Sequence, residues 1–283
     1  MANIKNIKLA DILKVRKSHT FSRLLPGLIL LIPFVLIVLF VPYFPLQDPM
    51  EVNTAIRHQP PSFEHFFGTD AIGMDVFSRV LYATRIDFLI SILCVLIAVS
   101  IGVPLGAAAG YFGGILETIT SRLIEIFQSF PIMLFTMIIR IVLGPSIIYL
   151  AGAIGVCIAP FYAKLVRSII KPLRDIDYIQ AAKVTGQTSL QIIFRHLIPN
   201  ALPAIASQFT LSAAVSIRIV AGLSFLGLGV PTPTPEWGSM IQIGAGWVIF
   251  GIWWPSVFPG LALFFTIWCL SQISQELESM YTL

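Results

Sequence analysis

Six long apolar runs divide this chain, and each is long enough to cross a membrane as a helix. A spanning helix needs about 20 mostly apolar residues, because no water inside the bilayer can satisfy an open backbone. The pattern predicts spans at residues 24–44, 88–109, 123–143, 147–166, 201–223 and 248–273. We therefore predict an all-α membrane protein of about six transmembrane helices.

Two long polar stretches lie between these runs. Residues 45–87 follow the first run and carry six acidic and three basic side chains, and residues 168–200 lie between the fourth and fifth runs. The predicted parts are an N-terminal segment at 1–23, a first transmembrane helix at 24–44, a loop at 45–87, and a five-helix core at 88–283 that contains the 168–200 loop.

Glycine and proline fall inside two of the predicted spans. Gly102, Pro104, Gly106 and Gly110 lie in the second span, and Pro131 lies in the third. Such residues can interrupt a helix, and small residues can also let neighbouring helices pack closely. The sequence leaves both interpretations open.

The composition excludes a soluble domain. Hydrophobic residues make up 57% of the chain and charged residues 11%, whereas soluble domains have roughly 45–50% and 25%. The three cysteines all lie in apolar runs and the four histidines are scattered, so we predict no metal site.

The basic residues give the predicted orientation. Six of the eighteen Lys and Arg residues lie in residues 1–23 and six in 164–195. Basic residues favour the cytoplasmic side, so we place both segments and both termini in the cytoplasm and the 45–87 loop outside. The net charge of +4 then reflects contact with membrane lipid, not with nucleic acid. Residues 1–23 suit either an amphipathic helix on the inner membrane surface or a disordered tail.

The 168–200 loop contains signals for two short helices. A capping box places a polar side chain at the helix N-cap and a glutamine three residues later. Two such pairs occur, Asp177 with Gln180 and Thr188 with Gln191. Gly186 would end the first helix in the left-handed conformation, and Pro199 would stop the second. The spacing alone also suits a solvated connector.

The same loop resembles the signature of the permease subunits of bacterial ABC importers. That signature is Glu-Ala-Ala, then Gly four residues after the second Ala, then Ile/Leu-Pro. The matching residues here are Gln180, Ala181, Ala182, Gly186, Ile198 and Pro199. Gln180 stands where the family has glutamate, and glutamine keeps the capping geometry.

The resemblance implies a type I ABC importer permease fold in which this loop is a coupling helix. A coupling helix docks into a groove on a cytoplasmic ATPase subunit, a helix-in-groove contact. The residues expected to couple to the ATPase are Gln180, Ala181, Ala182, Lys183, Gly186, Arg195, His196 and Pro199. The implied partners are a homologous second permease subunit, two ATPase subunits and an extracytoplasmic solute-binding protein. The implied location of this chain is a bacterial inner membrane.

Further motifs resemble the dipeptide, oligopeptide and nickel branch of this family. They lie at residues 68–79, 106–114, 122–131 and 223–238. The resemblance implies short peptides as cargo. Val220, which stands where the family often has glutamate, is followed by Ala221 and Gly222 and is more similar to nickel and metallophore permeases. Uptake of nickel or another metal chelate is therefore the alternative. Residues 271–274 depart from the usual family ending.

The chain carries no motif for ATP or for catalysis. It has no Gly-x-x-x-x-Gly-Lys-[Ser/Thr] loop, in which backbone N–H groups cradle phosphates. We therefore predict a non-catalytic subunit that binds no cofactor, with ATP-Mg used by the partner ATPase subunits.

Two basic residues within the apolar runs, Arg140 and Arg218, are candidates for the translocation path. Ionisable residues inside a membrane are functional hypotheses by default, although both could simply reach the lipid headgroups. A secondary carrier or channel without an ATPase is the alternative of another class. The chain shows neither an internal repeat nor an acid–base relay that would favour it.

Overall fold

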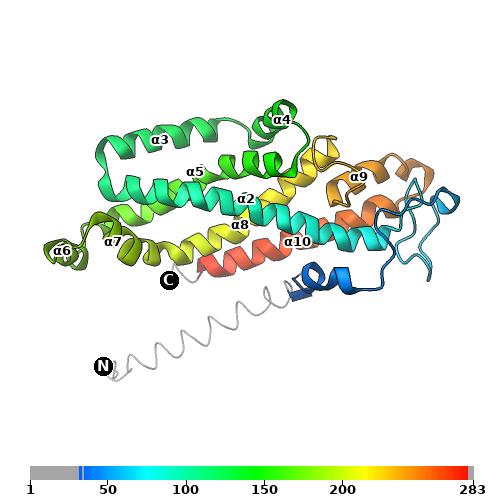
Figure 1. The fold of residues 1–283 in the computed structure, drawn as a ribbon, viewed down its shortest axis with the longest axis horizontal. Coiled ribbons are helices and arrows are strands. Elements are labelled where there is room, and N and C mark those ends of the chain that lie inside the picture. Colours follow the sequence, from blue (N-terminus) through cyan, green and yellow to red (C-terminus); the bar gives the residue numbers. More distant parts are fainter. Residues whose placement is uncertain (1–31, 34, 280–283) are drawn as a thin grey trace, which may run out of the picture.

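The computed structural model describes residues 32–33 and 35–279, and every regular element within them is a helix (Figure 1). The predicted all-α architecture is therefore confirmed. The α-helices from residue 76 onwards are α2 (Val76–Phe112), α3 (Gly114–Ser129), α4 (Ile132–Leu143), α5 (Ile147–Leu173), α6 (Asp177–Val184), α7 (Ser189–Ile192), α8 (Ile198–Phe225), α9 (Trp237–Ala245) and α10 (Trp254–Ser279).

The remaining described elements are short turns, the 3-10 turns η1 (Val41–Tyr43), η2 (Thr54–Ile56) and η4 (Val248–Phe250) and the π turn η3 (Ile193–Leu197). The predicted interfacial helix at residues 1–23 lies outside the described residues. So do residues 24–31 and 34 of the predicted first span; residues 35–40 are helical.

Four stretches in the described part of the chain are long and apolar enough to cross a membrane. They are α2, α5, the continuous helix Ser189–Phe225 that joins α7, η3 and α8, and α10. The pair α3 and α4 makes a fifth crossing if it is counted as one span, and it is bent by 86°. Pro131 is the N-cap of α4 at this bend, where a proline cannot continue the preceding helix.

Glycines inside α2 serve helix packing and do not interrupt it. The helix is continuous over 37 residues with Pro104 inside it. A Cβ atom at Gly102 or Gly106 would collide with a backbone carbonyl oxygen of α5, that of Ala159 or Ala163. These glycines let the two helix backbones approach closely, as small residues do in membrane bundles.

Several predicted helix boundaries are wrong, including the span at 123–143, which is the bent pair α3 and α4, and two others have a clear local cause. Helix α2 begins at Val76, because the Asp75 side chain accepts a hydrogen bond from Ser78 N at 2.8 Å and caps it. The predicted start at residue 88 lies about three turns inside the helix. Helix α10 begins at Trp254 and not at residue 248, because the chain leaves η4 through Gly251 with φ of 81°. A polar cap and a single turn are too local to alter a hydropathy pattern.

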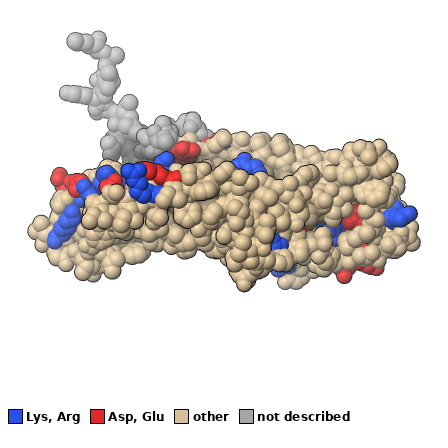
Figure 2. Space-filling view, turned by 90° about the horizontal axis from the view of Figure 1, so that it is seen from above, with Lys and Arg blue, Asp and Glu red and all other residues tan. Residues whose placement is uncertain are grey.

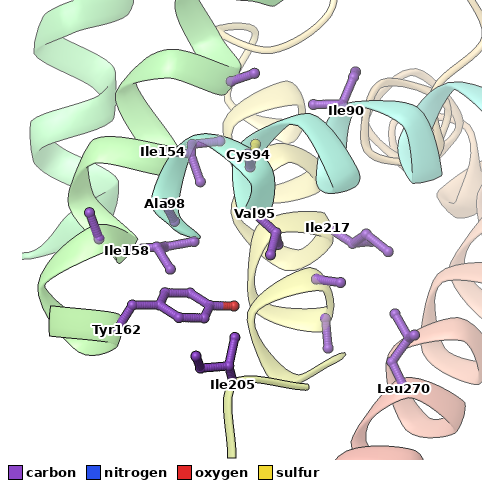
Figure 3. Close-up of a cluster of buried hydrophobic side chains, with 14 of the residues drawn as sticks. Ile90, Cys94, Val95, Ala98, Ile154, Ile158, Tyr162, Ile205, Ile217 and Leu270 are labelled. Carbon is purple, nitrogen blue, oxygen red and sulfur yellow. The ribbon is translucent and has the colours of Figure 1, made fainter. Parts of the chain in front are cut away.

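The core lies where α2, α5 and α8 meet. Ile154 and Ile158 of α5 lie beside Cys94 and Ala98 of α2, and Tyr162 of α5 points towards α8, with α10 on the far side of α8 (Figure 3). These side chains are almost fully buried. The long helices therefore form one packed bundle that holds the loops at its two ends.

The two ends of this elongated bundle differ in content (Figure 1). The α6 end consists of α6, α7 and η3 with the adjoining ends of α2, α3 and α5. The α9 end consists of residues 45–75, residues 226–253 including α9, and the start of α10. Figure 2 shows charged side chains gathered at the two ends, with a largely uncharged band between them, as expected for a surface that faces lipid.

Candidate ATPase-coupling site

The predicted coupling residues lie together at the α6 end, in the turn between α5 and α8 (Figure 1). Helix α6 packs one face on the bundle: Ile179 and Ala182 are buried in the same core cluster as Ile170 of α5 and Ile192 of α7. This buried apolar contact holds the loop to the spans. Because packed interiors transmit strain, a displacement of α6 would also displace the helices on which it packs.

The N-terminus of α6 differs from its prediction. The N-cap is Ile176, which offers no side-chain hydrogen bond, and Asp177 is the first residue of the helix. The predicted capping box of Asp177 with Gln180 is therefore wrong. Asp177 still favours this helix end through the helix dipole. Gln180 Nε2 instead donates to the carbonyl oxygen of Arg174 at 3.1 Å, which ties α6 to the end of α5.

Gly186 ends α6 as predicted. Its φ is 81°, a left-handed conformation that favours glycine. Gly186 N donates to Lys183 O at 3.0 Å and Gln187 N donates to Ala182 O at 3.2 Å. These two bonds are the pattern of a Schellman motif, and they fix the direction in which the chain leaves the helix.

The second short helix is capped as predicted. Gln191 N donates to Thr188 Oγ1 at 3.3 Å, and Thr188 N donates to Gln191 Oε1 at 2.9 Å, a complete capping box.

The predicted stop at Pro199 is wrong, because the helix continues from Ser189 to Phe225. Pro199 lies in the first turn of α8, just after the π turn η3. A proline there needs no backbone N–H partner, and the widened turn accommodates its ring.

Two more of the predicted residues link the parts of the loop. The His196 ring Nε2 and the Gln187 side-chain Oε1 lie 2.9 Å apart, so η3 holds the turn after Gly186. The Lys183 ammonium lies 5.7 Å from the centroid of the Tyr111 ring at the end of α2, a cation–π arrangement. Arg195 and Pro199 are exposed.

Three apolar side chains that the sequence did not single out are exposed at this end. Val184 is 88% exposed, Leu190 65% and Phe194 63%. They come from α6, α7 and η3 in turn, among charged and polar neighbours. Exposed apolar groups rimmed by polar residues are typical of protein interaction sites. The signal in the sequence was the presence of large apolar residues in an otherwise polar loop.

The two predicted path residues lie away from this loop. Arg140 of α4 is buried, and its guanidinium donates to the carbonyl oxygens of Leu228 at 3.0 Å, Gly229 at 2.6 Å and Gly144 at 2.6 Å. Arg218 is exposed on α8. Arg140 thus holds the segment that follows α8.

A second buried arginine holds the same part of the chain. Arg79 of α2 donates to the carbonyl oxygens of Pro49 at 2.7 Å and Pro233 at 3.2 Å, and its Nε lies 4.0 Å from Asp70 Oδ2. Glu236 is fully buried and caps α9 by accepting hydrogen bonds from the backbone N–H groups of Gly238 and Ser239. Burial raises the pKa of this carboxyl.

Known proteins resemble this chain over most of its length. Residues 102–281 match the family described as binding-protein-dependent transport system inner membrane component. The dipeptide transport system permease protein DppC of Alkalihalophilus pseudofirmus is 37% identical over 89% of this chain and 83% of its own length. The probable D,D-dipeptide transport system permease protein DdpC of Escherichia coli is 36% identical over 84% of this chain and 80% of its own.

A solved structure shares the fold. A chain from inward-facing conformations of the MetNI methionine ABC transporter superposes with a TM-score of 0.50 at 18% identity, covering 70% of this chain and 96% of the other. The likeness confirms the predicted type I importer fold. In an ABC importer, ATP is hydrolysed by partner subunits and the permease subunit is not catalytic. The helical bundle, the loop and these relatives show that the chain belongs to the family of binding-protein-dependent transport system inner membrane components, as a permease subunit of an ABC importer.

Proposed function

We propose that this permease forms half of a translocation pathway for short peptides. The curated relatives described above are dipeptide permeases that match most of the chain, which supports this cargo. The other half would be a homologous permease subunit, with a solute-binding protein delivering the peptide and two ATPase subunits using ATP-Mg.

The observation that carries the coupling role is the exposed apolar surface of Val184, Leu190 and Phe194. We define these three residues as the docking surface. They lie at the end of the bundle that the basic residues assign to the cytoplasm, where no lipid would cover them. A groove on an ATPase subunit would bury them, and Ile179 and Ala182 would carry its movement to the core.

One sequence feature favoured a metal chelate as the alternative cargo. Val220 replaces a glutamate that is frequent in the family, but its side chain is buried in the packed core. An apolar residue suits that position whatever the cargo. The structure of this position therefore adds no support for the metal alternative.

The cargo is tested with the neighbouring binding protein, isolated gently and examined by mass spectrometry. We expect bound short peptides. A bound nickel or other metal chelate would contradict the peptide proposal and support the alternative.

The coupling role is tested by substitution in the turn. Gly186→Pro replaces a residue at φ of 81° with one fixed near −65° and removes the N–H bonded to Lys183 O. We expect the ATPase subunits to dissociate or to hydrolyse ATP without transport. Gly246→Pro is the matched control, because it also removes a bonded N–H, the one that donates to Gly244 O, but Gly246 has φ of −64° and lies at the other end of the bundle. Transport that persists with no ATPase present would overturn the importer proposal itself.

A further inference from the structure

The start of α3 is joined to the end of α5 by two polar contacts at the α6 end. Lys171 Nζ of α5 lies 2.7 Å from Glu117 Oε1 of α3. One turn away, the Arg167 guanidinium donates a hydrogen bond to Ser121 Oγ. Residues four apart share one face of a helix, so the two contacts form successive rungs between facing sides of α3 and α5.

The same end of α5 is joined to the coupling loop. Arg174 is the C-cap of α5, three residues beyond Lys171, and its carbonyl oxygen accepts the hydrogen bond from Gln180 of α6. A displacement of α6 would therefore act on the last turn of α5, and through the rungs on α3.

The far end of the α3–α4 pair holds the segment after α8. We call residues 114–143 the connector; Figure 1 shows α3 running along the bundle from the α6 end towards α4. On α4, Arg140 donates to the carbonyl oxygens of Leu228 and Gly229. The connector thus makes specific polar contacts at both ends of its length, with the 86° bend between them.

We propose that the connector transmits movement of the coupling loop to residues 226–235 at the α9 end, with Glu117, Lys171 and Arg140 as positioning residues. This inference rests on the proposed coupling role of the loop. The Glu117–Lys171 pair is partly exposed, and such pairs contribute little to folding stability. We therefore expect it to act chiefly on the relative position of α3 and α5. A coupling between two sites is typically worth about 5-fold or more in equilibrium.

The first test exchanges the charges of the rung in the complete importer, reconstituted with its ATPase subunits and binding protein. We expect Glu117→Lys and Lys171→Glu each to keep the ATPase subunits bound and to reduce the stimulation of ATP hydrolysis by loaded binding protein by about 5-fold. The double exchange should recover most of that stimulation. If charge reversal unfolds the protein, Glu117→Gln breaks the ion pair at equal size and must show the same loss.

The matched control is the second ion pair of α3. Arg122 and Glu125 also lie 2.7 Å apart, but both are on α3 and both are exposed. Exchanging their charges should leave the stimulation unchanged. An equal loss in this control, or a double exchange of Glu117 and Lys171 no better than either single variant, would overturn the proposal.

A second test asks whether the two ends of the connector belong to one path. Arg140→Lys keeps the charge but replaces the planar guanidinium group with an ammonium group, which cannot bind the same carbonyl oxygens together. We expect it to reduce stimulation as Glu117→Lys does, and the two together to be no worse than either alone, because coupled residues are not additive. If the double variant instead loses stimulation by the product of the two single losses, the two ends do not share a path. If all these variants behave as wild type while Gly186→Pro still uncouples, only the connector fails and the coupling role stands.

Discussion

The two ends of the bundle are held together by different means. At the α6 end, the loop is built from local hydrogen bonds, the Schellman turn at Gly186 and the capping box of Thr188, and its docking surface is exposed. At the α9 end, buried Arg79 and Arg140 reach carbonyl oxygens more than twenty residues away in the chain. The loop at the α6 end is folded by contacts that are close in the sequence and leaves a surface for a partner, although α3 and α5 beside it are joined by the Glu117–Lys171 pair. The loops at the α9 end are fixed by long-range polar contacts.

Among substitutions that compare the two ends, we expect Arg79→Met at the α9 end to lower the stability of the protein most. It leaves Asp70 and the carbonyl oxygens of Pro49 and Pro233 without their buried partner. Removing one partner of a buried charge costs about 3 kcal/mol or more, so the midpoint of thermal unfolding should fall. Arg57→Met, at an exposed position of the same end, is the control. Equal midpoints for the two variants would contradict the importance of the long-range contacts.

A smaller effect is expected at the α6 end from Gly186→Ala. An L-residue in the left-handed conformation costs about 1–2 kcal/mol, and no atom lies within 4 Å of the added Cβ, so strain is the whole effect. Gly152→Ala is the control, because Gly152 also has open space around it but lies inside α5. The free energy of unfolding should fall for the first variant only. Equal changes would show that Gly186 is not needed for the turn.

The smallest effect is expected from Thr188→Ala. It removes the hydroxyl that accepts from Gln191 N, and loss of an N-cap costs about 1 kcal/mol. Hydrogen exchange of the backbone amides of α7 should quicken about fivefold while α8 is unchanged. Thr118→Ala, which removes only an exposed bond to Gly114 O within α3, should leave exchange in α7 as it is. Faster exchange throughout α8 would mean that the end is not a local unit.

This difference also explains what could be predicted from the sequence. Gly186 and the Thr188–Gln191 pair were predicted correctly from residues within three or four positions. The Asp177–Gln180 pair is equally local but was wrong, because Gln180 donates to the carbonyl oxygen of Arg174 at the end of α5 instead. Pro199 was misjudged, because a π turn that admits the proline leaves no pattern in the sequence.

At the α9 end little could be predicted. Arg140 stood out as a charge in an apolar run, but its partners Leu228 and Gly229 lie almost ninety residues away. Backbone carbonyls carry no sequence signature, so only the packing of α4 beside the end of α8 reveals the contact. The apolar runs predicted the spans, and the polar contacts that position the loops had to come from the structure.

We propose that the docking surface at the α6 end binds an ATPase subunit. The most direct measurement is co-purification of the ATPase subunits with a Phe194→Ser variant. Phe63→Ser is the matched control, because Phe63 is also an exposed phenylalanine, 98% exposed, but lies at the α9 end. We predict that Phe194→Ser loses most of the bound ATPase and Phe63→Ser keeps it. Full retention of the ATPase by Phe194→Ser, or equal loss in both variants, would show that this surface does not bind the ATPase.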